Sequence, residues 1–170
     1  MRCWLLVAVL ACCACDHGLD AGPPGQSGIA GRLHFSGQWP AEAEEVAVAV
    51  YENTPREVAE LYQLSGWDTG VEVGAQTYDY FVPIERDGTY RWVIVAWRSK
   101  GSFWDFRSLL GCYHAAGDTL PTPVTVVLGQ ATGGVDIAVD FGVLSGEEVP
   151  GYNLCVGALP GELVGSAGGG

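Results

Sequence analysis

Hydrophobic and polar residues alternate along several short segments of the chain. In residues 27–35, Ile29, Leu33 and Phe35 fall on one parity, whereas Arg32 and His34 fall on the other. An alternation of period two is typical of a β-strand with one face buried and the other in solvent. The same criterion, combined with β-branched content and flanking turn residues, predicts about seven strands. Their ranges are residues 27–35, 45–51, 77–84, 90–97, 109–113, 124–128 and 135–141.

Residues 55–64 depart from this alternation. Pro55 can occupy a first helical turn, and Val58, Leu61 and Tyr62 recur near helical spacing, so we expect a short helical insertion there. Elsewhere no long helix and no alternation of strands with helices is predicted. This pattern favours an all-β fold, an antiparallel sandwich, over a parallel sheet. A closed barrel is the alternative.

Three of these segments share features with one known family of β-domains. Residues 87–97 combine an Asp-Gly turn, a threonine and an aromatic residue with a hydrophobic strand, and residues 29–35 place a glycine inside an apolar opening strand. Residues 134–141 form a closing strand of alternating character. Together they resemble the prealbumin-like domains, the carboxypeptidase regulatory-like and transthyretin-like group. The resemblance implies a prealbumin-like β-sandwich that serves as an accessory, scaffold or ligand-binding module, although the insertion at residues 55–74 is longer than expected.

The first residues of the chain have the layout of a secretion signal. Arg2 precedes an apolar stretch that ends before Asp16, and this stretch is shorter than the about 20 apolar residues that a membrane-spanning helix needs. Leucine and small residues lead directly into cysteine, which resembles a bacterial lipobox. We expect Cys15 to be the acylated residue, with Cys13 and Cys12 as alternatives. An ordinary signal peptide with incidental cysteines is the other interpretation.

This leader sets the expected domain organisation. Residues 1–14 are a lipoprotein signal peptide, and residues 15–26, which are rich in glycine and proline, are a flexible tether. Residues 27–144 are the sandwich domain, and residues 145–170 are a Gly/Pro-rich tail. The expected location is the cell envelope, anchored in a membrane on its extracytoplasmic side, at the cell surface or in the periplasm.

The charge of the chain excludes one class of partner. Its formal net charge is −12, with 8 basic and 20 acidic side chains. Such a surface repels the phosphates of nucleic acids, so we expect no nucleic-acid binding.

Two cysteines, Cys112 and Cys155, lie outside the leader. In an oxidising compartment an even pair predicts a disulfide, and two unpaired thiols are the alternative. Cys112 and His114 are two residues apart and would share a strand face, which is a start toward a zinc site. Two ligands do not complete such a site, so we expect no metal and no cofactor.

No motif of a known catalytic site occurs in the chain. The serine nucleophile elbow, the metal-binding His-Glu-x-x-His helix and the phosphate-binding loop with lysine are all absent from the sequence. We therefore expect no catalytic residues and no enzyme activity. A small hydrolase whose site is assembled from distant loops is the less favoured alternative.

Aromatic residues in the predicted loops are the candidates for binding. Trp67 and Trp104 could stack on sugars or anchor a protein partner, and Lys100 and Arg107 accompany Trp104 in one loop of an otherwise acidic chain. The alternative is that Trp104 and its neighbour Phe103 fold inward to cap the domain. These features predict a lipid-anchored, non-catalytic module that binds an envelope protein or a saccharide; a carbohydrate-binding module or adhesin is the runner-up.

Overall fold

The computed structural model describes residues 25–118, 120–142 and Cys155. These residues form ten strands and two 3-10 helices, so the expectation of an all-β fold is confirmed. The elements are β1 (Gly28–Ser36), β2 (Ala43–Tyr51), η1 (Val58–Tyr62), β3 (Gly66–Asp68), β4 (Thr77–Pro83), β5 (Gly88–Tyr90), β6 (Trp92–Ser99), η2 (Phe106–Ser108), β7 (Leu109–Cys112), β8 (Val124–Val126), β9 (Ala131–Thr132) and β10 (Ile137–Asp140).

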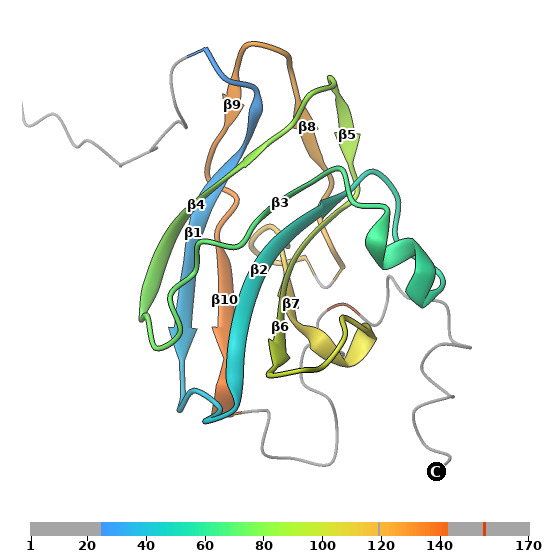
Figure 1. Ribbon diagram of the computed structural model, residues 1–170. Helices are drawn as coiled ribbons and strands as arrows, with labels where there is room; N and C mark the ends of the chain where they lie inside the picture. Colours follow the sequence, from blue (N-terminus) through green and yellow to red (C-terminus); the bar gives the residue numbers. More distant parts are fainter. Residues whose placement is uncertain (1–24, 119, 143–154, 156–170) are drawn as a thin grey trace, which may run out of the picture.

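The first sheet has the strand order β10-β1-β4, with β9 also beside β1 (Figure 1). β4 runs antiparallel to β1, whereas β9 and β10 run parallel to it, with Leu33 opposite Ile137. The expectation of a purely antiparallel arrangement is therefore wrong for this edge. Two parallel strands that lie side by side must be joined by a long crossover connection. Between β1 and β10 this connection comprises most of the domain, and no local sequence pattern predicts such a pairing.

The second sheet has the order β3-β2-β6-β7, and β5 pairs with β8 in a separate two-stranded ribbon. β2 and β6 pair along their whole length, from Ala43 opposite Ser99 to Tyr51 opposite Trp92. The strand expected at residues 90–97 is broken at Arg91, so that Gly88–Tyr90 joins β8 and Trp92–Ser99 joins β2. Each of the seven expected ranges contains a strand, but β3, β5 and β9 bring the number in the described residues to ten, so the expected count of about seven is not confirmed.

A hydrophobic core joins the two larger sheets. Buried side chains from β1, β4 and β10 meet buried side chains from β2 and β6 in one cluster. Its members include Ile29, Leu33, Val82, Ile137 and Val139 from the first sheet, and Val46, Val48, Val50, Val93 and Val95 from the second. Arg32 and His34 are exposed, as the alternation predicted, and Asp136 and Asp140 of the closing strand are exposed too.

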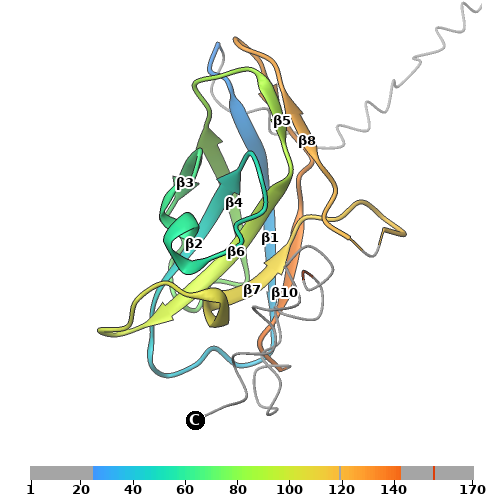
Figure 2. The ribbon, with the colours of Figure 1, turned by 90° about the vertical axis from the view of Figure 1, so that its right-hand side faces the viewer.

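The second sheet is also buried on its other face, which we call the outer face. Here Ala49 and Tyr51 of β2 and Ile94 and Ala96 of β6 form a second cluster, whose other members include Leu61, Trp92, Phe106, Leu109, Cys112 and Cys155. η1 and η2, the teal and yellow coiled ribbons, lie over this face (Figure 2). The expected helix in residues 55–64 is thus the single 3-10 helix η1, and it helps to cover the sheet.

The sulfur atoms of Cys112 and Cys155 are joined in a disulfide, the pairing that the sequence analysis expected. Cys155 is fully buried in the outer-face cluster. A bonded Cys112 has no thiolate to offer, so it cannot begin a zinc site with His114. Among the residues the structure describes, no helix is long and apolar enough to cross a membrane.

Several expectations lie outside the described residues. These are the signal peptide at residues 1–14, the acylated cysteine at Cys15, Cys13 or Cys12, the tether apart from its last two residues, and the tail at residues 145–170 apart from Cys155.

The close approach of β1 to the closing strand gives the first testable prediction. A Cβ atom at Gly31 would overlap the carbonyl oxygen of Val135, whereas one at Gly111 would lie 3.4 Å from the carbonyl oxygen of Ala138. We expect Gly31→Ala to lower the free energy of unfolding by about 1–3 kcal/mol, the usual cost of overpacking. Gly111→Ala, the matched control, should be close to neutral in the same urea titration. Equal stability of the two variants would contradict this packing.

Candidate functional site

A pocket of about 240 Å³ opens on the outer face of the second sheet. Its floor is formed by β2 and β6, and its walls come from η1, β3 and the segment that leads into η2. The floor includes Ala47, Ala49, Ile94 and Ala96, and the walls include Leu61, Tyr62, Leu64, Trp67, Trp104 and Leu109. The pocket is therefore almost entirely apolar.

The alternation of valine and alanine along β2 explains why space remains on this face. Val46, Val48 and Val50 point into the core, and Ala47 and Ala49 point outward, where the single methyl group of alanine fills little volume. Ala96 on β6 lies opposite Ala47 in the register of the two strands. Side chains that cover this face from above cannot reach the floor everywhere, and a cavity is left.

Two hydroxyl groups hold the η1 wall in place. Tyr51 Oη donates to the carbonyl oxygen of Leu61 at 2.8 Å, which ties η1 to β2. Tyr62 Oη donates to the carbonyl oxygen of Trp104 at 3.2 Å, which links η1 to the opposite wall. The two walls of the pocket are therefore connected directly.

The second wall is fixed by a capping box at the start of η2. Asp105 Oδ1 accepts hydrogen bonds from the backbone N–H groups of Arg107, at 2.8 Å, and Ser108, at 3.2 Å. Ser108 Oγ accepts in return from the backbone N–H of Asp105 at 3.1 Å. The pattern Asp-x-x-Ser is a local sequence signal for such a cap, and the sequence analysis missed it.

The structure brings together the two tryptophans that the sequence analysis proposed for binding. Trp67 is 56% exposed, and Trp104 is half-buried against the outer-face cluster, with the Arg98 guanidinium 5.7 Å from the centre of its ring. The alternative of inward packing holds in part for Trp104. It does not hold for Phe103, which is 85% exposed.

The two proposed cations, Lys100 and Arg107, are exposed and do not line the pocket. They lie on either side of Trp104 in the chain, within the segment that forms one wall. Within the described part of the chain neither forms an ion pair, whereas Arg98 pairs with Glu44 at 3.2 Å and Glu45 at 2.7 Å. The pocket lining carries one charged side chain among the described residues, that of Asp105, whose carboxylate accepts from the backbone N–H of Arg107.

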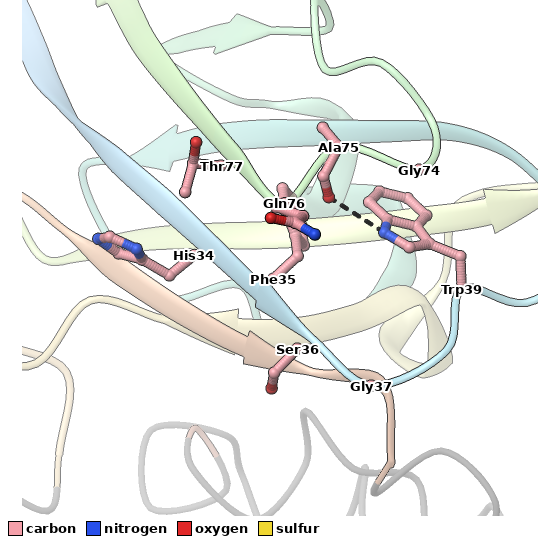
Figure 3. A pocket seen from close by; sticks show the side chains of 9 residues that line it. All are labelled: His34, Phe35, Ser36, Gly37, Trp39, Gly74, Ala75, Gln76 and Thr77. Atoms are coloured by element: carbon pink, nitrogen blue, oxygen red, sulfur yellow. Dashed lines mark hydrogen bonds between the residues drawn. The ribbon is translucent and has the colours of Figure 1, made fainter.

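A second hollow lies at the end of β1, lined by His34, Phe35 and Trp39 among others (Figure 3). It is larger, about 540 Å³, but it is an open hollow, and His34 and Trp39 lie at opposite ends of it. The Trp39 ring packs at 4.5 Å from that of Phe141, and its Nε1 donates to the carbonyl oxygen of Ala75 at 3.1 Å. Trp39 is thus used in structural packing, and the outer-face pocket is the better candidate site.

One titratable group that lines the outer-face pocket has a perturbed pKa. Burial, assisted by the neighbouring Tyr62, raises the pKa of Tyr51 from 10.0 to about 12, so its phenol is neutral at physiological pH and cannot act as a base there. No group of three or more His, Cys, Asp or Glu side chains that could hold a metal is found in the part of the chain that the structure describes.

Comparisons with protein-family models, with curated proteins and with solved structures find no significant match to this chain.

The raised pKa of Tyr51 predicts a pH-dependent stability. The phenol of Tyr51 ionises less readily in the folded state than in the unfolded state. The contribution of the neutral Tyr51 side chain to the free energy of unfolding is therefore fully present below pH 10 and is lost as the pH rises from 10 toward 12. We expect Tyr51→Phe to cost about 0.5–1.5 kcal/mol at pH 8, since the Leu61 carbonyl loses its donor. This deficit relative to wild type should shrink above pH 10 in urea titrations, and a deficit that stays constant to pH 12 would contradict the assignment.

Proposed function

We propose that this protein is a lipid-anchored, non-catalytic binding module of the cell envelope, which meets its partner through the outer-face pocket. The anchor is supported by the leader, in which Arg2 and an apolar stretch run into Cys12, Cys13 and Cys15. The Gly/Pro-rich residues that follow are suited to a tether between membrane and domain.

We further propose that the domain is a prealbumin-like sandwich. The three segments that resemble this group form β1, β5 with β6, and β10 with the residues that flank it. These strands belong to the two larger sheets and to the ribbon beside them, and one hydrophobic core joins the two larger sheets. A rigid double layer of this kind is a stable support for binding groups carried on its connections.

One observation carries the binding function. Trp67 and Trp104, which are far apart in the sequence, line the same apolar pocket and remain accessible to a partner. Large aromatic side chains around an apolar depression are typical of sites that bind ligands or proteins. A carbohydrate-binding module is the second candidate, because exposed tryptophan rings can also stack on sugars.

Photo-crosslinking in living cells tests both parts of this proposal. Benzoylphenylalanine replaces Tyr62, which lines the pocket and is 56% exposed. In the matched control it replaces Leu128, which is 52% exposed and lies outside the pocket lining.

The protein is then purified from native membranes, and its intact mass is measured before and after reduction. We expect two or three acyl chains on an N-terminal cysteine, a gain of two hydrogens on reduction, and an adduct from position 62 alone.

Three outcomes would overturn parts of the proposal. An unmodified, soluble chain would remove the anchor. Equal adducts from Tyr62 and Leu128 would remove the pocket as the contact site. Turnover of an ester or glycoside substrate by the purified protein would replace the binding module with a hydrolase.

A further inference from the structure

The hydroxyl groups that line the outer-face pocket are already used within the protein. Those of Tyr51 and Tyr62 donate to backbone carbonyl oxygens, and that of Ser108 accepts from the backbone N–H of Asp105. The Asp105 carboxylate in turn accepts two backbone hydrogen bonds. Each polar group that an occupant buries here without a partner weakens its binding. The pocket is therefore suited to an uncharged, apolar group.

The size of the pocket limits this group to one side chain. An apolar cavity of about 150 Å³ is enough to bind benzene, and pockets for drug-sized ligands start at about 300 Å³. At about 240 Å³ the outer-face pocket lies between the two. It matches one aromatic ring or one branched aliphatic side chain.

The disulfide holds Cys155 beside this pocket. The Cα atoms of Cys155 and Cys112 are 6.1 Å apart, and Cys112 lies opposite Ile94 in the pairing of β7 with β6. Ile94 is part of the pocket floor. Residues opposite each other in an antiparallel pair have Cα atoms about 4.5–5.5 Å apart and point to the same face. The Cα atom of Cys155 is therefore at most about 12 Å from that of Ile94.

The chain that follows Cys155 has the reach and the chemistry to enter the pocket. Residues 156–164 include Leu159 and Leu163, and Glu162 is their single charged side chain. An extended chain spans about 3.3–3.6 Å per residue, so the stretch from Cys155 to Leu159 spans up to about 13–14 Å. A short tether of this kind gives an effective concentration on the order of millimolar. The disulfide thus keeps two leucines within reach of a cavity that fits one.

We propose that residues 156–164 place a leucine side chain in the outer-face pocket, as an internal ligand that a partner must displace. This inference rests on the proposed function, because it concerns access to the same pocket. The alanine floor and the two tryptophans supply the contact area, and the disulfide supplies the tether. Since a tether and not the sheet holds this occupant, it leaves when a partner, or a larger side chain on the floor, takes its place.

Fluorine NMR of the purified full chain, labelled with 5-fluorotryptophan, tests this occupancy. The Trp67 and Trp104 signals are assigned by replacing each residue with phenylalanine, and the signal of Trp39, outside the pocket lining, reports that the fold is intact. The probe is benzene. Leu159→Asp combined with Leu163→Asp puts charges where the leucines are, and a carboxylate is costly to bury in an apolar cavity. We expect this variant to shift both pocket signals and to bind benzene with a midpoint at least tenfold lower than wild type.

The matched control adds the same two charges beyond the segment, in Ser166→Asp combined with Ala167→Asp. We expect its tryptophan signals and its benzene midpoint to equal those of wild type. Equal benzene midpoints in all three proteins would overturn the inference, because the pocket would then be open in wild type. Benzene binding in none of them would remove the pocket and the inference together.

Cross-linking separates this inference from the proposed function. Benzoylphenylalanine in place of Tyr62 should form an internal cross-link to residues 156–164 in the purified protein, found by peptide mapping, whereas in place of Leu128 it should not. A partner adduct at position 62 in cells, without this internal link, would leave the proposed function standing while the inference fails. An internal link without any partner adduct would support the inference and remove the partner site.

Other occupants of the pocket give different results, and each would overturn the inference. Links between two chains in place of internal links would indicate a second copy of the protein. Wild-type pocket signals that shift saturably with maltose would indicate a saccharide. Shifts on adding phosphatidylglycerol vesicles would indicate a lipid surface.

Discussion

The pairing of β2 with β6 is the interaction on which the rest of this structure depends. These two strands form the centre of the second sheet, and their side chains are buried on both faces, against the first sheet on one side and against η1 and η2 on the other. A sheet with apolar side chains on both faces is not stabilised by packing on one face alone, because its outer face must also be shielded from water. The insertion after β2, the loop after β6 and the disulfide at Cys112 all contribute to that shielding.

The candidate site forms where the cover over the outer face is incomplete, because the side chains of the sheet are small there. Where alanines form the floor, the covering aromatics leave an apolar pocket whose walls are fixed by the Tyr51, Tyr62 and Asp105 hydrogen bonds. The hydroxyl groups of Tyr51, Tyr62 and Ser108, which line this apolar and partly open cavity, all take part in hydrogen bonds within the protein. Among the residues described, no cluster of three or more potential metal ligands is found.

The sequence predicted most strands because their period-two pattern is local. Long-range pairing carries no such pattern, which is why the parallel pairing of β1 with β10 and the break at Arg91 were not predicted. Trp67 and Trp104 were singled out as loop aromatics, but their convergence depends on how η1 and η2 pack over β2. Lys100 and Arg107 shared a loop with Trp104 in the sequence, and the structure places them outside the pocket lining.

The measurement that tests this account most directly is the free energy of unfolding of Ala49→Leu. A leucine at this position would project from the floor into the pocket. If the packed sheets and their cover leave this space open, as the account predicts, the added carbons bury apolar surface, and the stability in urea stays within about 0.5 kcal/mol of wild type or rises. A loss of about 1–3 kcal/mol, the usual cost of overpacking, would show that side chains of the packed domain already fill this space and that no pocket exists there.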